Sequence, residues 1–258
     1  MLGRAQRLGG HAWSTIAIEL VIVVLGVFIG MQVSNWNQDR MTARQAADFT
    51  ARLKADLREE DWRYRFLLTY SQEVLANAKL AVGDLEGTRP LSDEALLVAA
   101  YRATQYSEAM SRRTTYDELL STGAIGLIRD NMLRETAMRV YTNVRVFENL
   151  AQEGIRSRYR EAFRMNFTND LQHALARDCG DKYIRPGDFA SIAGVLDYPC
   201  HLDVPADVVS AAAATLRSSP EMRSYLRLRI ADLETRIGDL RVNNKAVMEG
   251  LRAISNQP

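Results

Sequence analysis

WSTIAIELVIVVLGVFIGMQVSNW, residues 13–36, is a long apolar stretch with a single charged side chain, Glu19. About 21 helical residues counted from Trp13 would rise about 31 Å, close to the roughly 30 Å hydrocarbon thickness of a bilayer. Trp13 and Trp36 bracket the stretch, where the aromatic side chains of membrane proteins prefer to lie. The stretch therefore predicts one transmembrane helix at 13–36, preceded by an N-terminal tail at 1–12.

A cleaved signal peptide is the alternative, because Arg4 and Arg7 would supply the basic region that precedes such a run. However, GMQVSNWN at the end of the stretch lacks the small-x-small pattern of a cleavage site, and the apolar run is longer than usual for a signal peptide. We therefore expect an uncleaved anchor. The nearby charges do not orient it, since Arg40 and Arg44 follow the span just as Arg4 and Arg7 precede it.

The composition of the whole chain is that of a folded globular protein, with 258 residues, 47% hydrophobic and 25% charged. A net charge of +1 argues against a protein devoted to nucleic acid, which normally carries a strong basic excess. Six prolines and fifteen glycines leave room for long helices. We predict an all-α fold, in which the transmembrane helix is followed by a helical-bundle domain at 37–258 with a loop-rich segment near 177–205.

The chain after Asn37 predicts one helix of about 45 residues that continues directly from the membrane span, because no Gly or Pro separates the two before Gly83. Its apolar side chains recur at helical spacing: Phe49, Leu53, Leu57, Tyr64, Leu67, Val74 and Ala78. Gly83, Gly87 and Pro90 predict a turn after it, and Ser92 is expected to cap the next helix.

The segment TYDE, Thr115–Glu118, predicts a capping box in which the threonine and glutamate side chains bind backbone N–H groups at a helix start. Gly123 is expected to end that short helix in a left-handed conformation. The pattern that follows predicts a further long helical tract over residues 131–175.

The last predicted helix begins at Ser219, a good N-cap, with Pro220 in its first turn. Residues then recur in alternating steps of four and three: Leu226, Ile230, Leu233, Ile237, Leu240, Asn244, Val247, Leu251 and Ile254. This is a heptad register with Ile230, Ile237 and Asn244 at a positions. It suits a parallel two-stranded coiled coil between chains or an antiparallel bundle within one chain, and both alternatives stay open.

Cys179 and Cys200 are the only two cysteines, and they flank the most loop-like part of the chain. A disulfide between them would stabilise that loop by roughly 3 kcal/mol and would need an oxidising compartment. Two unpaired buried thiols, or a zinc site completed by His173 and His201, are the alternatives. The disulfide favours a single-pass protein of the cell inner membrane, with a cytoplasmic N-terminus and a periplasmic helical domain.

Glu19 lies on the same narrow stripe of the predicted membrane helix as Gly26 and Gly30, given a rotation of about 100° per residue. The two glycines form a GxxxG element, which permits close approach of a second helix, and an acid on that stripe would face the partner. Alternatively, the Glu19 side chain extends to the headgroups, because it lies only six residues after Trp13. The sequence favours neither hypothesis.

Two families resemble parts of this chain. IELVIVV, from Ile18, is similar to the start of a type IV pilin, although Ser14 stands where pilin processing needs glycine. IAIELVIVVLGVFIGMQVSNWNQDR and TYDELLSTGAIGLIRD resemble an uncharacterised bacterial family of single-span membrane proteins, a domain of unknown function. The second resemblance implies a membrane-anchored, mainly helical domain, and it implies no activity or catalytic residue.

Sequence motifs of phosphate binding, metal binding or nucleophilic catalysis do not occur, and we expect no cofactor. The three histidines, His11, His173 and His201, are isolated in the sequence. We therefore expect a non-enzymatic, membrane-anchored module for sensing, scaffolding or assembly. The alternatives are a pilin-like or secretion-apparatus component and a membrane-tethered hydrolase. The expected partners are the lipid bilayer and a second copy, through the transmembrane or C-terminal helix, and any small-molecule ligand is open.

Overall fold

The computed structural model describes residues 9–107, 111–142 and 156–256. Within these ranges all regular structure is helical and no strand occurs, so the predicted all-α fold is confirmed. The helices, in chain order, are α1 (Gly9–Leu85), α2 (Asp93–Ala103), α3 (Thr114–Ser121), the 3-10 helix η1 (Ala124–Leu127), α4 (Asn131–Thr142), α6 (Arg158–Asn166), α7 (Asn169–Cys179), α8 (Ala206–Ser218), α9 (Pro220–Gly238), the π-helical segment η2 (Asp239–Asn243) and α10 (Lys245–Ser255).

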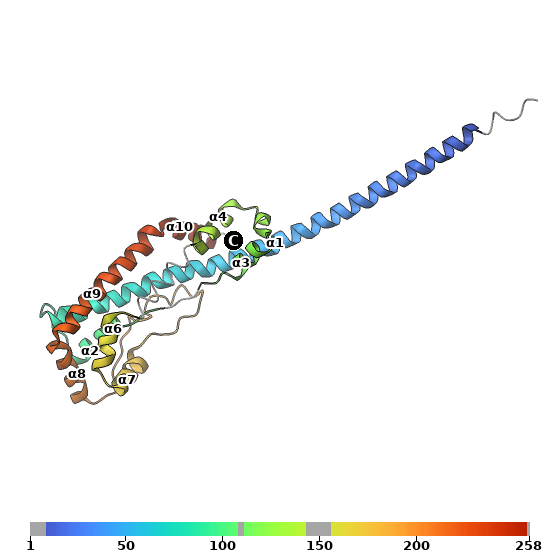
Figure 1. Cartoon of the computed structure of the whole chain (residues 1–258). Helices are drawn as coiled ribbons and strands as arrows, with labels where there is room; N and C mark the ends of the chain where they lie inside the picture. The colour runs from blue at the N-terminus through green and yellow to red at the C-terminus, as the bar shows by residue number, and fades with distance from the viewer. Residues whose placement is uncertain (1–8, 108–110, 143–155, 257–258) are drawn as a thin grey trace, which may run out of the picture.

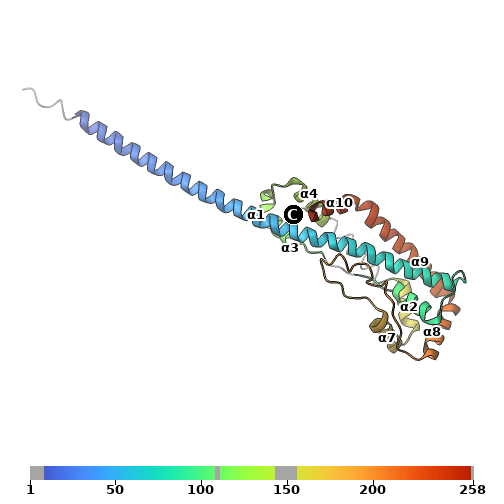
Figure 2. The same cartoon turned by 180° about the vertical axis from the view of Figure 1, so that it is seen from behind.

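Helix α1 is continuous over 77 residues, about 115 Å at the usual rise per residue. Its N-terminal part extends away from the rest of the chain (Figures 1 and 2), and every described side chain from Trp13 to Gln45 is exposed. This part is long and apolar enough to cross a membrane. From Phe49 onward the same helix buries an apolar stripe, and all seven residues of the predicted stripe are buried.

Two hydrophobic cores follow one another along α1. The proximal core packs the 49–67 part of α1 against α3, α4 and α10. The distal core packs the 70–85 part against α2, α6, α7, α8 and α9. Leu53, Leu57 and Val74 are fully buried, and each such side chain contributes about 1.5–3 kcal/mol. Burial in both cores stabilises the 49–85 part of α1 as one helix.

Helices α9 and α10 return along α1 in the opposite direction (Figures 1 and 2). The predicted heptad face packs within the chain: Ile237 and Asn244 are buried and Ile230 is half-buried, with both helices against α1. The prediction of one uninterrupted helix is wrong at η2. There the Asn244 N–H donates to the Asp239 carbonyl at 3.1 Å, five residues back, and the Asn244 side chain donates to the same oxygen at 3.0 Å.

Two other local predictions need correction. Helix α3 has Arg113 at its N-cap with no side-chain cap, so the Thr115–Glu118 capping box does not form. The carboxylate of Asp56, from α1, accepts the N–H of Thr115 at 3.4 Å instead. The long tract predicted over 131–175 is broken before α7, where the Thr168 hydroxyl caps a new helix start. Residues 143–155 of that tract lie outside the described residues.

Other predicted helix ends are confirmed. The side chains of Ser92 and Ser219 accept hydrogen bonds from the first turns of α2 and α9. Gly123 follows α3 with φ of 69°, the left-handed conformation that glycine adopts without a Cβ clash.

The C-terminal end of α2 is bound by arginines from other helices. Arg160 donates through Nη1 to the Thr104 carbonyl at 3.0 Å, and Arg229 donates to the carbonyls of Ala103 and Gln105 at 3.3 and 2.8 Å. These carbonyls lie at the negative end of the helix dipole, where the helix itself supplies no donor. Burial is the main cause that lowers the pKa of Arg229 to about 10. The arginines thus satisfy buried backbone groups.

Candidate functional site

The candidate functional site is a pocket of about 450 Å³ on α1, next to the junction of the two cores. We call it the aromatic pocket. It is lined by α1, by the chain after α2 and by the loop after α7: Glu59, Glu60, Trp62, Arg63, Phe66, Tyr70, Tyr106, Ser107, Asp181, Lys182, Tyr183, Ile184, Pro186 and Val195. Its size is in the range of small-molecule sites.

Three aromatic residues of α1 form one wall of the aromatic pocket. Trp62, Phe66 and Tyr70 are spaced four residues apart, so they lie on one face of the helix. The Trp62 and Phe66 rings stack with centroids 5.1 Å apart, and the Phe66 and Tyr70 centroids are 5.7 Å apart. The indole N–H of Trp62 donates to the Asp188 carbonyl at 3.1 Å, which fixes the orientation of the ring. The wall is therefore apolar and held in place.

A hydroxyl–carboxylate pair lies beside this wall. The Tyr70 hydroxyl donates to Asp181 Oδ2 at 2.6 Å. Asp181 is an exposed residue as a whole, but its carboxyl group lies among the atoms of the pocket wall. This burial raises the pKa of the carboxyl group. Burial, followed by the charge of Asp181, also raises the pKa of the Tyr70 hydroxyl well above its ordinary value. Within the described residues Asp181 Oδ1 accepts no hydrogen bond, so one acceptor remains for a ligand.

A buried ion pair contributes the polar side of the aromatic pocket. Glu60 and Arg63 are almost completely buried, and Arg63 Nε donates to Glu60 Oε2 at 2.7 Å. The other oxygen of Glu60 accepts from the Ser111 hydroxyl and from the Arg112 N–H, at 2.7 and 2.9 Å. The carboxylate is thus fully engaged in structure, because a buried charge needs such partners.

The loop that lines the aromatic pocket is also bound to α1 through the carboxylate of Glu73. Glu73 accepts three backbone N–H groups of the loop, from Gly194 at 2.8 Å, Leu196 at 2.7 Å and Asp197 at 3.1 Å. Hydrogen bonds to a charged acceptor are stronger than those between neutral groups. Glu73 therefore positions the loop across the helix.

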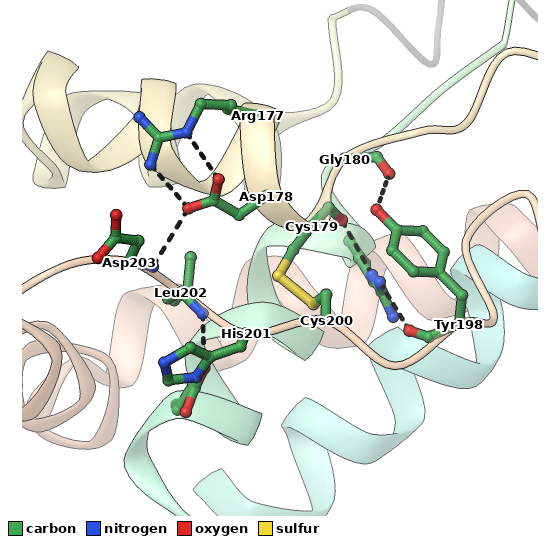
Figure 3. Close-up of a disulfide and its surroundings, with 11 residues drawn as sticks. Arg177, Asp178, Cys179, Gly180, Tyr198, Cys200, His201, Leu202 and Asp203 are labelled. Atoms are coloured by element: carbon green, nitrogen blue, oxygen red, sulfur yellow. Dashed lines mark hydrogen bonds and ion pairs between the residues drawn. A yellow bond between two sulfur atoms is a disulfide. The ribbon is translucent and has the colours of Figure 1, made fainter.

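The disulfide closes the same loop at its two ends (Figure 3). The sulfurs of Cys179 and Cys200 lie 2.08 Å apart and their Cα atoms 5.4 Å apart. Arg102 donates to the carbonyls of Cys179 and Tyr198, both at 3.1 Å, and the Tyr198 hydroxyl donates to the Gly180 carbonyl at 2.6 Å. The disulfide and these hydrogen bonds fix the loop next to Asp181.

The cysteine arrangement does not suit the zinc alternative, because both sulfurs are bonded to each other. Nδ1 of His201 instead lies 2.9 Å from Oε1 of Glu94, and His173 lies on α7. Within the described part of the chain no group of three or more His, Cys, Asp or Glu side chains is arranged to hold a metal ion.

Glu19, Gly26 and Gly30 lie on the exposed part of α1, far along the chain from the aromatic pocket. A Cβ added at either glycine would meet no described atom within 4 Å, so space for a partner helix exists there. Whether the stripe pairs with another helix stays a prediction.

Sequence reasoning missed the aromatic pocket. The spacing of Trp62, Phe66 and Tyr70 was visible, but at helical spacing such residues also suit an ordinary core. Asp181 comes from a loop 111 residues after Tyr70 in the chain, and the sequence contains no signal that brings them together.

Replacing Glu73 by glutamine tests the binding of the loop to α1. The amide keeps an acceptor oxygen but loses the charge, so we expect backbone amides near Gly194–Asp197 to exchange about tenfold faster with deuterium. The measurement is hydrogen exchange on the full chain in detergent. The control is Glu135→Gln on α4, whose carboxylate is exposed and pairs only with Arg139 at 3.7 Å among the described residues. Equal exchange of the loop in both variants would contradict this role of Glu73.

The two segments that resemble the uncharacterised membrane family lie in different places. The first belongs to the exposed part of α1, and the second, Thr115–Asp130, covers most of α3 and all of η1. Membership of that family stays a prediction. Comparison of the chain with family models, with curated proteins and with solved structures gives no match.

Proposed function

We propose that this protein is a single-pass, membrane-anchored sensing module that binds a small molecule in its aromatic pocket. The observation that carries the proposal is the continuity of α1. The helix that is long and apolar enough to cross a membrane also supplies one wall of the pocket. A ligand in the pocket thus touches the same helix that carries the apolar segment, with Glu59 about 39 Å along the helix from Val33.

The lining groups support binding more than catalysis. Each carboxylate of the aromatic pocket already has a partner: Glu59 with Arg112, Glu60 with Arg63, and Asp181 with Tyr70. A hydrolase would need an acid or base that reaches its substrate, and among these carboxylates only one oxygen of Glu59 and one of Asp181 have no described partner. The groups open to a ligand include the apolar wall and one oxygen of Asp181. They suit a small ring-bearing amine, whose ring packs on the wall and whose nitrogen donates to Asp181.

The disulfide supports a periplasmic position for the domain, because disulfides persist in oxidising compartments. On this proposal the N-terminus is cytoplasmic and the chain crosses the cell inner membrane once. A conformational signal would then pass inward along α1, if the ligand prefers one arrangement of the loop relative to that helix.

Reporter fusions after Pro258 test this orientation. We expect a phosphatase that folds only in an oxidising compartment to be active at this position, and a fluorescent protein that fails to fold after export to be dark. The matched control fuses both reporters before Met1, where the opposite pattern is expected. A bright fluorescent protein and inactive phosphatase at the C-terminus would contradict the periplasmic position.

Trp62 provides a direct test of ligand binding. Trp13→Phe with Trp36→Phe leaves it as the only tryptophan of the three in the chain. The measurement is the fluorescence of Trp62 in the full chain in detergent. At least one member of a panel of ring-bearing amines is expected to change this fluorescence in a saturable way.

Two further variants locate the binding. Asp181→Asn should weaken it about tenfold through loss of a charged hydrogen bond, whereas Asp170→Asn, outside the pocket, should leave it unchanged. The proposal fails if no amine gives a saturable change, or if both aspartate variants bind as the unsubstituted chain does.

A further inference from the structure

A second pocket, of about 360 Å³, lies between the end of α2 and helices α6 and α7. We call it the cationic pocket. Its polar lining includes Arg160 and Arg164 of α6 and Asn169, Gln172 and His173 of α7. It shares no described lining residue with the aromatic pocket, although the guanidinium of Arg160 lies over the ring of Tyr106, which belongs to the other one.

The charge of the cationic pocket is of one sign. Two arginines and a histidine line it, and no carboxylate occurs among its described lining residues. Within the described residues neither Arg160 nor Arg164 forms an ion pair, whereas arginines such as Arg63, Arg112 and Arg217 do. The pocket is therefore a concave surface with two guanidinium groups that form no ion pair within the described residues, although the charge of Arg160 also acts on Asp181 of the aromatic pocket.

Arg160 is fixed in position and buried. Arg160 is 8% exposed. Its guanidinium lies over the ring of Tyr106, 4.5 Å from the ring centroid, and donates through Nη1 to the Thr104 carbonyl at 3.0 Å. Burial, and then the positive charge of Arg164, lower the pKa of Arg160. Both causes are unfavourable to the charged form, and an anion in the pocket would offset them.

Two other features of the cationic pocket suit an anion. Arg164 is exposed, one turn of α6 after Arg160, so a guanidinium is available at the opening. Asn169 is the first residue of α7, where the helix dipole is positive. Amide side chains of Asn169 and Gln172 add neutral donors, although the Gln172 amide already donates to the Arg164 and Phe167 carbonyls.

We propose that the cationic pocket binds a small soluble molecule through a phosphate or carboxylate group, held by the guanidinium groups of Arg160 and Arg164. A guanidinium presents two parallel N–H donors that match the two oxygens of such groups. A lipid headgroup is a poor occupant, because α6 and α7 lie near the end of α1 that is remote from its apolar segment (Figures 1 and 2). The proposal does not rest on ligand binding in the aromatic pocket.

Binding of inorganic phosphate and of succinate to the full chain in detergent tests the proposal by calorimetry at constant ionic strength. We expect saturable binding of at least one of the two. Arg164→Gln, which removes an exposed side chain and should leave the fold intact, is expected to weaken it about tenfold. Arg158→Gln is the matched control, since Arg158 is exposed on the same helix and lies outside the pocket.

Thermal unfolding of the same three proteins separates specific binding from a general salt effect. Phosphate stabilises many proteins by exclusion from their surface, and this effect would be equal in all three. We expect a smaller phosphate- or succinate-dependent rise in Tm for Arg164→Gln than for the other two proteins. The proposal would be overturned if neither anion bound in a saturable way. It would also be overturned if Arg164→Gln showed the same affinity and the same Tm shift as Arg158→Gln.

Discussion

The continuity of α1 is the constraint on which the rest of this structure depends. One helix carries an apolar segment that no described part of the chain covers, an exposed polar segment, and then the buried stripe around which the domain packs. An exposed helix gains no tertiary contacts, so its stability there comes from its own hydrogen bonds and, in our proposal, from lipid. The buried half is held by two cores, which set its position in the domain.

Charged side chains hold the structure together at the edges of the two hydrophobic cores. Glu60 and Arg63 form a buried pair beside the aromatic pocket, Glu73 binds three N–H groups of the loop, and Arg160 and Arg229 bind the carbonyls at the end of α2. Each of these charges binds polar groups, most of them at least partly buried, that regular helix hydrogen bonds leave without a partner. The same arrangement leaves two concave surfaces open, one apolar with an acid and one cationic.

Local periodicity and helix-end chemistry predicted the parts of the fold that depend on neighbouring residues. The stripe from Phe49 to Ala78, the caps at Ser92 and Ser219, and the turn at Gly123 follow from spacing or from one side chain, and the structure confirms them. Features set by distant residues were not predictable in this way. Asp56 replaces the expected cap of α3 from 59 residues earlier in the chain, and Asp181 reaches Tyr70 only through the folded loop. The break at η2 likewise falls where the heptad pattern is regular.

Distance measurement by electron spin resonance tests the continuity of α1 most directly. Spin labels at Gln38→Cys and Ala76→Cys, both exposed positions of α1, would report on the helix from its polar segment into the domain. The native cysteines would not take up the label, because they are bonded to each other. For a continuous helix in the full chain we predict a narrow distribution near about 57 Å, given the rise per residue. A broad distribution centred at a much shorter distance would show a hinge between the two parts and contradict the direct connection of pocket and anchor.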